Sequence, residues 1–189
     1  MESALIISNT EKSTSFFVEM LNAASCNQIF IVRSCGEARR RLLSRSFDLV
    51  IINAPLSDES GESLSRHISS NGISQSILVV KSEFYDAVSA VCEDDGVLVV
   101  AKPVNKTIFW SALKLAQASG ARIARMREEN SNLKQKLEDI RVVDRAKCIL
   151  ISYLNMSEQE SHRYIEKQAM DMRLSRRVIA EGILKTYEN

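Results

Sequence analysis

The sequence predicts an α/β fold in which a doubly wound, five-stranded parallel sheet precedes a long helix and a small helical bundle. Three observations point to this class. Five short runs rich in β-branched residues are apolar almost throughout, which is typical of strands covered on both faces. Stretches with helical periodicity separate these runs, as in βαβ units. Beyond residue 105 the strand pattern stops and only helical periodicity follows.

The predicted sheet is built from short elements in strict alternation. The five strands are expected at Ala4–Ser8, Gln28–Val32, Leu49–Asn53, Ser76–Val80 and Val97–Ala101. The helices between them are expected at about Lys12–Ala24, Gly36–Ser44, Glu62–Ser70 and Phe84–Glu93. Right-handed crossovers place such helices on both faces of the sheet, so we expect a flavodoxin-like arrangement.

A single long helix is expected from near Asn105 to near Leu154. Its middle carries residues spaced alternately by three and four, which is typical of the a and d positions of a parallel, dimeric coiled coil. These predicted dimerisation residues are Ile123, Met126, Asn130, Leu133, Leu137 and Ile140. Asn130 falls at an a position, where a buried Asn favours two strands. An amphipathic helix packed on its own domain would show the same pattern, and Gly120 could break the helix.

The remainder is predicted to add two shorter helices. Ser157 and Glu160 have the spacing of a capping box, and Ser175 can cap the last helix. The predicted domains are therefore a sheet domain at 1–120, a coiled-coil linker at 121–140 and a three-helix domain at 141–189.

Composition excludes several classes of protein. The 189 residues carry a net charge of +1, but from Arg122 onward 14 basic residues face 11 acidic ones, so any basic surface lies in the C-terminal part. The four cysteines are scattered, which argues against a zinc site and suggests small buried side chains in a reducing cytoplasm. We expect no signal peptide, no membrane span, no cofactor and no metal. His67 and His162 are isolated, so we expect no enzymatic activity.

In an open parallel sheet, ligands bind at the carboxyl ends of the strands. The residues expected there are Ser8, Asn9, Thr10, Asn53, Pro55, Lys81, Ser82 and the pair Lys102-Pro103. With the loop "APLSDESG" at residues 54–61, this pattern resembles the receiver domain of response regulators in two-component systems. The resemblance covers about the first 120 residues and implies that the peptide bond before Pro103 is often cis.

The departures from the receiver pattern bear on chemistry. The family's magnesium-binding acids are replaced by Ser8, Asn9 and Thr10, and its phosphoacceptor aspartate is Asn53 here. The family's switch residue falls on Lys81 or Ser82. Magnesium prefers anionic oxygen ligands, and a neutral amide is not a competent nucleophile. We therefore expect a pseudo-receiver without aspartyl phosphorylation, in which Lys102 bonds to Asn53, to neighbouring carbonyls or to Asp58.

The last 50 residues resemble an ANTAR domain, a three-helix module that binds RNA in transcription antiterminators. The matching segments are "DRAKCIL" at 144–150, "YIEKQAMDMR" at 164–173 and "RRVIAEGIL" at 176–184; Cys148 departs from the family, which usually has Gly. The same domain order occurs in some amidase-operon and ethanolamine-utilisation regulators. The predicted RNA-binding residues are Arg141, Arg145, Ala146, Lys147, Arg163, Lys167, Arg173 and Arg176.

These observations predict a cytoplasmic homodimer that binds paired hairpins in leader RNA and is controlled by a partner protein or a ligand. Two other hypotheses remain open. One is a signalling adaptor that dimerises and binds proteins but not RNA. The other is a regulator that is phosphorylated on an unconventional residue.

Overall fold

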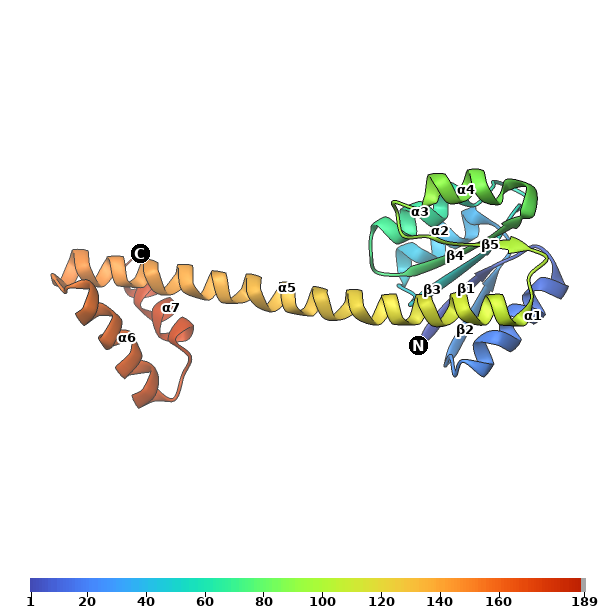
Figure 1. Ribbon diagram of the computed structural model, residues 1–189. Helices are drawn as coiled ribbons and strands as arrows, with labels where there is room; N and C mark the ends of the chain where they lie inside the picture. Colours follow the sequence, from blue (N-terminus) through green and yellow to red (C-terminus); the bar gives the residue numbers. More distant parts are fainter. Residues whose placement is uncertain (188–189) are drawn as a thin grey trace. The chain divides into compact units, whose positions relative to one another are not determined.

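The chain alternates strands and helices up to residue 102 and is helical thereafter, as the computed structural model shows for residues 1–187 (Figure 1). The strands are β1 (Ser3–Ile7), β2 (Gln28–Val32), β3 (Leu49–Asn53), β4 (Gln75–Lys81) and β5 (Leu98–Lys102). The helices are α1 (Glu11–Ala23), α2 (Cys35–Ser44), α3 (Glu62–Ser70), α4 (Tyr85–Cys92), α5 (Lys106–Leu154), α6 (Glu158–Met172) and α7 (Arg176–Tyr187). A short 3-10 turn, η1 (Ser82–Phe84), precedes α4.

The five strands form one parallel sheet in the order β2-β1-β3-β4-β5. This confirms the predicted fold class, with predicted and observed strand ends differing by at most one residue. Strands β1 and β3 are buried along their whole length, which explains why they are apolar almost throughout. The register aligns Asn53 with Val79 and Lys81 with Lys102, so the ends of β3, β4 and β5 lie at one edge of the sheet.

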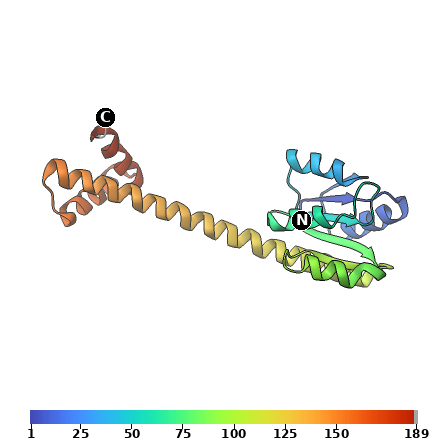
Figure 2. The same ribbon diagram turned by 90° about the horizontal axis from the view of Figure 1, so that it is seen from above.

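Helices cover both faces of this sheet, as Figures 1 and 2 show. On one face, α2, α3 and α4 pack against it through side chains such as Ala38, Leu64 and Val88. On the other face, α1 and the first turns of α5 pack through residues that include Phe17 and Phe109. The sheet and these helices belong to the N-terminal unit, residues Met1–Arg125.

Helix α5 is one element of 49 residues, so Gly120 does not interrupt it. At this glycine the helix passes close to β4, because a Cβ atom there would lie 3.3 Å from Cγ of Gln75. The helix begins after Asn105, whose side-chain Oδ1 accepts a hydrogen bond from the backbone N–H of Ile108. Among the described residues, none of the helices has the length and apolar character needed to cross a membrane.

The C-terminal unit, Met126–Asn189, contains the rest of α5 together with α6 and α7; its last two residues lie outside the described part of the chain. Its small core consists of Ala146, Leu150, Ile165, Ala180 and Leu184. The predicted capping box is present: Ser157 accepts from the backbone N–H of Glu160, whose carboxylate accepts from the backbone N–H of Ser157. The expectation of four buried cysteines is wrong for Cys148, which is exposed on α5.

Candidate functional site

The first candidate site is the strand-end pocket, formed around Asn53 at the carboxyl edge of the sheet. Asn53 ends β3 and is only 3% exposed. Its Nδ2 donates hydrogen bonds to Oγ of Ser8 at 3.1 Å and to Oγ1 of Thr10 at 3.2 Å. Its Oδ1 is buried without a hydrogen-bond partner among the described residues. The amide therefore ties the end of β3 to the loop after β1, where Asn9 is exposed.

Lys102 approaches the strand-end pocket from β5. Its Nζ donates to the backbone carbonyl of Ala54, which is one of the alternatives predicted from the sequence. Burial, with a smaller contribution from nearby Lys81, lowers the pKa of Lys102. Lys81 is the register partner of Lys102 and pairs with Glu83 at 3.4 Å, while the Ser82 hydroxyl donates to the Lys102 carbonyl. Both candidate switch positions thus lie beside Lys102, whose bond to Pro103 is cis, as is Ala54–Pro55.

Asp58 does not pair with Lys102, contrary to the third alternative. Its carboxylate accepts from the backbone N–H groups of Cys35 at 3.2 Å and Gly36 at 2.9 Å, at the first turn of α2. These bonds, chiefly the one from Gly36, lower the pKa of Asp58. Glu59, its neighbour, pairs with Arg39. Asp58 and Glu59, the acids that follow Asn53 most closely in the sequence, therefore both bond to residues of α2.

The strand-end pocket does not have the donors that magnesium requires. The receiver fold implies a magnesium ion held by carboxylates, but the side chains gathered here are the hydroxyls of Ser8 and Thr10 and the amide of Asn53. Their oxygens are neutral, and magnesium binds through anionic oxygen ligands in octahedral geometry. The residues present do not fit the ion.

The second candidate site is the cationic surface of the C-terminal unit. Exposed basic side chains come from all three helices and from the α6–α7 turn. They are Arg141 and Arg145 on α5, Arg163 and Lys167 on α6, Arg173 in the turn, and Arg176 on α7. The turn is compact because Arg173 adopts a left-handed conformation with φ of 56°. Basic residues that are up to 35 positions apart in sequence thus belong to one small domain.

Some of the predicted RNA-binding cations are already held in ion pairs within the C-terminal unit. The side chain of Lys147 is only 17% exposed, and its Nζ lies 2.8 Å from Asp144 and 3.0 Å from Glu158, which raises its pKa. Arg176 lies 3.2 Å from Glu166. Binding a phosphate at either cation would compete with these carboxylates, whereas no ion pair of Arg163 or Lys167 is found among the described residues.

Ala146 is fully buried in the small core of the C-terminal unit, so its role is helix packing and the prediction of an RNA contact there is corrected.

Sequence reasoning missed two features of this unit. Arg177 bridges α5 and α7 by pairing with Asp139 at 2.7 Å and with Glu181 at 2.8 Å. The exposed ring of Tyr153 lies 5.4 Å from that of Tyr187, and Tyr164 is also exposed. Only the fold brings these distant residues together.

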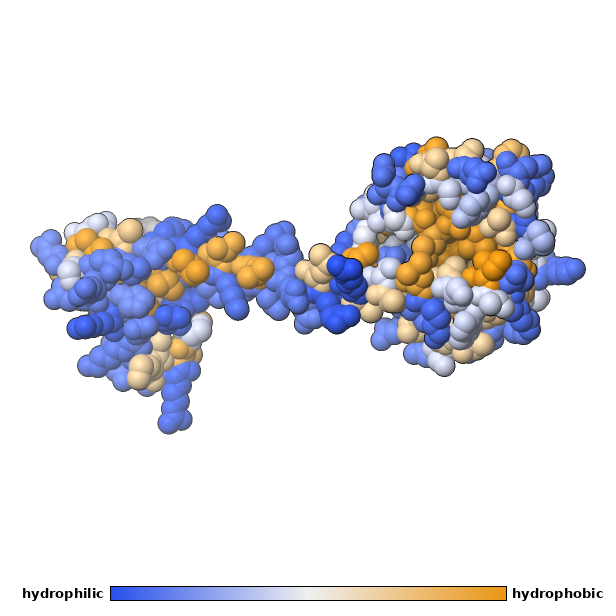
Figure 3. All heavy atoms as spheres, viewed as in Figure 1, coloured by the Kyte–Doolittle hydropathy of each residue, from blue (hydrophilic) through white to orange (hydrophobic). Residues whose placement is uncertain are grey.

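The predicted dimerisation residues lie along α5. Met126, Leu133, Leu137 and Ile140 are each more than half exposed, Asn130 is exposed and Ile123 is half-buried. Large apolar side chains at a and d spacing are the ones that the predicted coiled coil would bury. Within the C-terminal unit, Met126, Leu133, Leu137 and Ile140 form an exposed apolar stripe along α5 (Figure 3).

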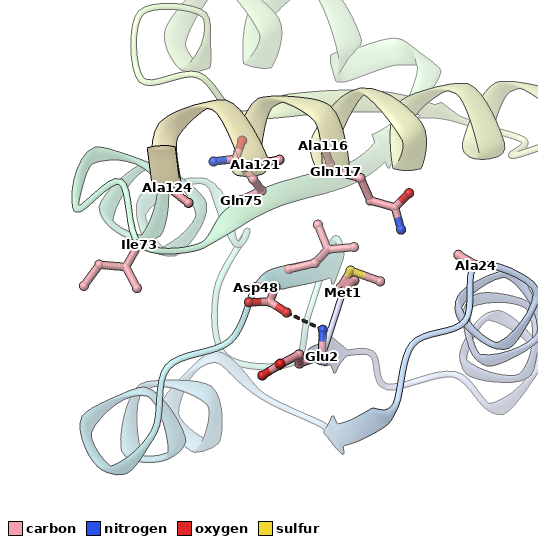
Figure 4. Close-up of a pocket in the computed structure, with 12 residues that line it drawn as sticks. Met1, Glu2, Ala24, Asp48, Ile73, Gln75, Ala116, Gln117, Ala121 and Ala124 are labelled. Atoms are coloured by element: carbon pink, nitrogen blue, oxygen red, sulfur yellow. Dashed lines mark hydrogen bonds between the residues drawn. The ribbon is translucent and has the colours of Figure 1, made fainter. Parts of the chain in front are cut away.

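A hollow of about 590 Å³ lies at the opposite, amino edge of the sheet, beneath α5 (Figure 4). Small side chains of α5, Ala116, Ala121 and Ala124, form one wall. Two acids, Glu2 and Asp48, line it, and the Asp48 carboxylate accepts from the backbone N–H groups of Glu2 and Ser3. The Asp48 carboxylate is therefore engaged in fixing the start of β1, and the hollow gathers no catalytic set of side chains.

Comparisons with known proteins found a matching domain family and a similar regulatory protein. Residues 131–184 match the ANTAR domain family. The transcriptional regulatory protein PdtaR of Mycobacterium tuberculosis is 26% identical over 139 residues, which cover 74% of this chain and 68% of the relative.

Solved structures are similar to the N-terminal part in fold. A two-component transcriptional regulator AraC from Clostridium phytofermentans aligns with a TM-score of 0.59 and 15% identity, covering 66% of this chain and 98% of that structure. A CheY-like response regulator receiver domain from Methylobacillus flagellatus aligns with a TM-score of 0.52 and 21% identity, covering 64% of this chain and 98% of that domain. The resemblance to receiver and ANTAR domains is thereby confirmed.

Proposed function

We propose that this chain, which joins a receiver-like domain to an ANTAR domain, is a transcription antitermination regulator that binds paired hairpins in leader RNA as a dimer. The observation that carries this proposal is the ANTAR match over residues 131–184, within a unit whose three helices expose basic side chains. The similarity to a protein named as a transcriptional regulator supports the same class of function. Its role is regulatory rather than enzymatic, and it acts in the cytoplasm, where transcripts are made.

RNA binding in this proposal uses the cationic surface of the C-terminal unit. Arg and Lys side chains neutralise phosphates, and exposed aromatic or guanidinium planes stack on unpaired loop bases. Arg145, Arg163 and Lys167 are exposed and supply charge, while Tyr164 supplies an exposed ring. Binding would stabilise one hairpin in the nascent transcript and so prevent a competing terminator hairpin from forming.

The dimer in this proposal forms through the exposed stripe of α5. Pairing would bury the four side chains that are more than half exposed, Met126, Leu133, Leu137 and Ile140. Burial of each large apolar side chain contributes roughly 1.5–3 kcal/mol. Asn130 at an a position would select a parallel, two-stranded register at some cost in stability.

The receiver-like domain in this proposal does not accept a phosphoryl group. The Asn53 side chain is a neutral amide that donates to Ser8 and Thr10, so it offers neither a nucleophile nor a metal ligand of the required charge. Incubation with acetyl phosphate and magnesium should leave the intact mass unchanged, whereas a stoichiometric phosphoryl adduct would contradict the proposal. Control therefore comes from a partner protein or a ligand.

Gel-shift titration with a leader RNA that carries two tandem stem-loops tests RNA binding. Arg145→Ala should weaken binding about three- to tenfold by removing a phosphate contact. Lys147→Ala should weaken binding less, because Asp144 and Glu158 compete with phosphate for that ammonium group. Neither substitution should affect dimerisation. Lys12→Ala, which removes an exposed lysine of α1, is the matched control and should bind normally.

Because Lys147 is also ion-paired, circular dichroism must first establish that its variant is folded. Increasing salt should weaken binding by the wild type, and each variant should show a shallower salt dependence. A dimer that ignores tandem stem-loops at low salt would contradict the proposal and leave the adaptor hypothesis in its place.

A further inference from the structure

A groove of about 410 Å³ lies between α2 and α3 in the N-terminal unit. Its floor is apolar, because it is lined by buried Leu64 and Ile68 and by half-buried Leu42. Two further lining side chains lie largely in solvent: Ile73 is 60% exposed and Leu43 is 89% exposed. Of the large apolar side chains that the structure describes, none is more exposed than Leu43. We refer to these five residues as the α2–α3 groove.

The position of Leu43 and Ile73 distinguishes them from ordinary exposed apolar residues. Single exposed apolar side chains are common on soluble proteins and need no explanation. Here, however, the two line the same depression as three less exposed apolar side chains. A concave apolar surface between two helices is the kind of surface on which the apolar face of a third helix docks.

Arginines are concentrated on α2 and just after it, beside the groove. Residues 35–46 contain four arginines and one acid, Glu37, although residues 1–121 as a whole contain 11 basic and 13 acidic residues. The four arginines are Arg39, Arg40, Arg41 and Arg45, and all are exposed. This surface is therefore positively charged within a part of the chain that is otherwise acidic.

The positive charge beside the groove is only partly compensated. Arg39 lines the groove and is paired with Glu59. No ion pair of Arg40 or Arg41 is found in the part of the chain that the structure describes. Arg40 precedes Leu43 by three residues, so the two side chains are neighbours on the surface of α2.

We propose that the α2–α3 groove binds an acidic amphipathic helix of a regulatory partner protein. Apolar side chains on one face of that helix would fill the groove, at the spacings of three and four residues that this docking mode uses. Glutamates or aspartates beside them would pair with Arg40 and Arg41, which favours association with acidic helices and disfavours basic ones. RNA or anionic lipid headgroups would meet the same charges but would leave the apolar floor unfilled.

The groove contains none of the residues proposed for RNA binding or dimerisation. It belongs to the receiver-like unit, whereas the cationic surface proposed for RNA belongs to the C-terminal unit. The inference specifies the chemistry of the partner protein in the proposed function and rests only on that part of it. Failure of RNA binding would therefore leave the inference standing.

A phage-displayed library of amphipathic helices, selected on the immobilised full chain, tests the proposal. The apolar anchors vary among Leu, Ile, Phe and Met, and the flanking positions vary among Glu, Lys and Gln. Counter-selection on Leu43→Asp, which circular dichroism must show to be folded, removes helices that bind other surfaces. The retained helices should carry Glu at least tenfold more often than Lys at the flanking positions. If no helix is retained, or if Glu is not preferred, the proposal is overturned.

Titration of the best-retained helix, followed by fluorescence anisotropy, tests the apolar contact. Leu43→Ser should weaken binding at least fivefold, because an apolar side chain no longer becomes buried on docking. Ser44→Ala, a substitution in the same turn of α2, should bind as the wild type does. Equal affinities of the two variants would contradict the proposal.

The same titration tests the charge contact. Arg40→Glu/Arg41→Glu should weaken binding at least tenfold and should prefer a version of the helix in which Lys replaces Glu. Lys12→Glu/Lys114→Glu reverses two exposed charges on α1 and α5, which cover the other face of the sheet, and should bind normally. Equal weakening by both double variants would show a general effect of net charge and refute the role of α2.

Gel shift with the tandem stem-loop RNA and co-sedimentation with phosphatidylglycerol vesicles test the other occupants. Arg40→Glu/Arg41→Glu should match the wild type in both measurements. If this variant loses RNA or vesicle binding and the library yields no acidic helix, the surface belongs to that polyanion and the proposal is overturned.

Discussion

At the scale of a single residue, Asn53 shows how one side-chain atom changes the chemistry of the strand-end pocket. Its Nδ2 donates to Ser8 and Thr10, whereas a carboxylate oxygen in the same place could only accept. The side chains of Asn53, Ser8 and Thr10 are therefore joined to one another by hydrogen bonds between neutral groups. A carboxylate there would carry a buried negative charge, which is costly without a compensating cation.

Replacement of Asn53 by Ala tests this stabilising role. Asn53→Ala should lower the free energy of unfolding by about 1–3 kcal/mol, because it removes one buried and one partly buried hydrogen bond and leaves the hydroxyl partners less well satisfied. Urea unfolding followed by the fluorescence of Trp110, which packs at the edge of the N-terminal core, reports this unit. Asn9→Ala, in the exposed loop beside it, should change the free energy by less than about 0.5 kcal/mol. Equal effects of the two substitutions would contradict the role.

Asp58 is predicted to make the stability of the N-terminal unit depend on pH. Hydrogen bonds from the first turn of α2 lower its pKa in the folded state, so its contribution is present above the unfolded value of about 3.9 and is lost as pH falls through the folded pKa. Asp58→Ala should therefore cost about 0.5–1 kcal/mol at pH 7, within the lower range for capping groups because the side chain is exposed.

The same Trp110 signal measures the difference between wild type and Asp58→Ala at pH 7 and at pH 3. The difference should shrink towards zero at the lower pH. Asp94→Ala, which removes an exposed acid near the end of α4, is the control and should show little difference at either pH. A difference that grows on acidification would refute the assignment.

At the scale of elements, local signals account for where the helices begin and how far they extend. The capping box of Ser157 and Glu160 satisfies backbone groups at the start of α6, and Asn105 does so at the start of α5. Gly120 is tolerated within α5 because packing against β4 supports that turn. Judged by helix propensity alone, a glycine inside a helix is expected to destabilise that helix.

Removing the capping box should loosen the first turn of α6. Ser157→Ala should destabilise this turn by about 1 kcal/mol, which corresponds to roughly fivefold faster hydrogen exchange of its amides. Gln159→Ala, a substitution in the same turn that leaves both capping bonds, should exchange at the rate of the wild type. If both variants exchange alike, the capping box does not hold the turn.

At the scale of the whole molecule, two different kinds of domain occur on one chain: a receiver-like sheet and an ANTAR helical unit. In the proposed dimer, two RNA-binding units are connected, so binding of the first hairpin makes binding of the second effectively intramolecular. Affinity for paired hairpins then depends on an interface that touches no RNA.

This dependence predicts a separation between dimerisation and RNA contact. Leu133→Ser/Leu137→Ser should yield a monomer that binds a single hairpin with normal affinity but binds the two-hairpin RNA at least tenfold more weakly than the wild type. Light scattering measures the mass and gel shift measures the two affinities. A monomer that keeps the full affinity for paired hairpins would show that avidity is not part of the mechanism.

The sequence by itself determined the sheet, the order of its elements, the length of α5 and the capping box of Ser157, because periodicity and caps are properties of a few consecutive residues. It also indicated the neutral chemistry around Asn53. Only the tertiary structure decided that Asp58 bonds to α2 rather than to Lys102, and that Ala146 is buried. These features depend on contacts between residues that lie tens of positions apart in the sequence. The conformational preferences of consecutive residues do not determine which distant residues pack together.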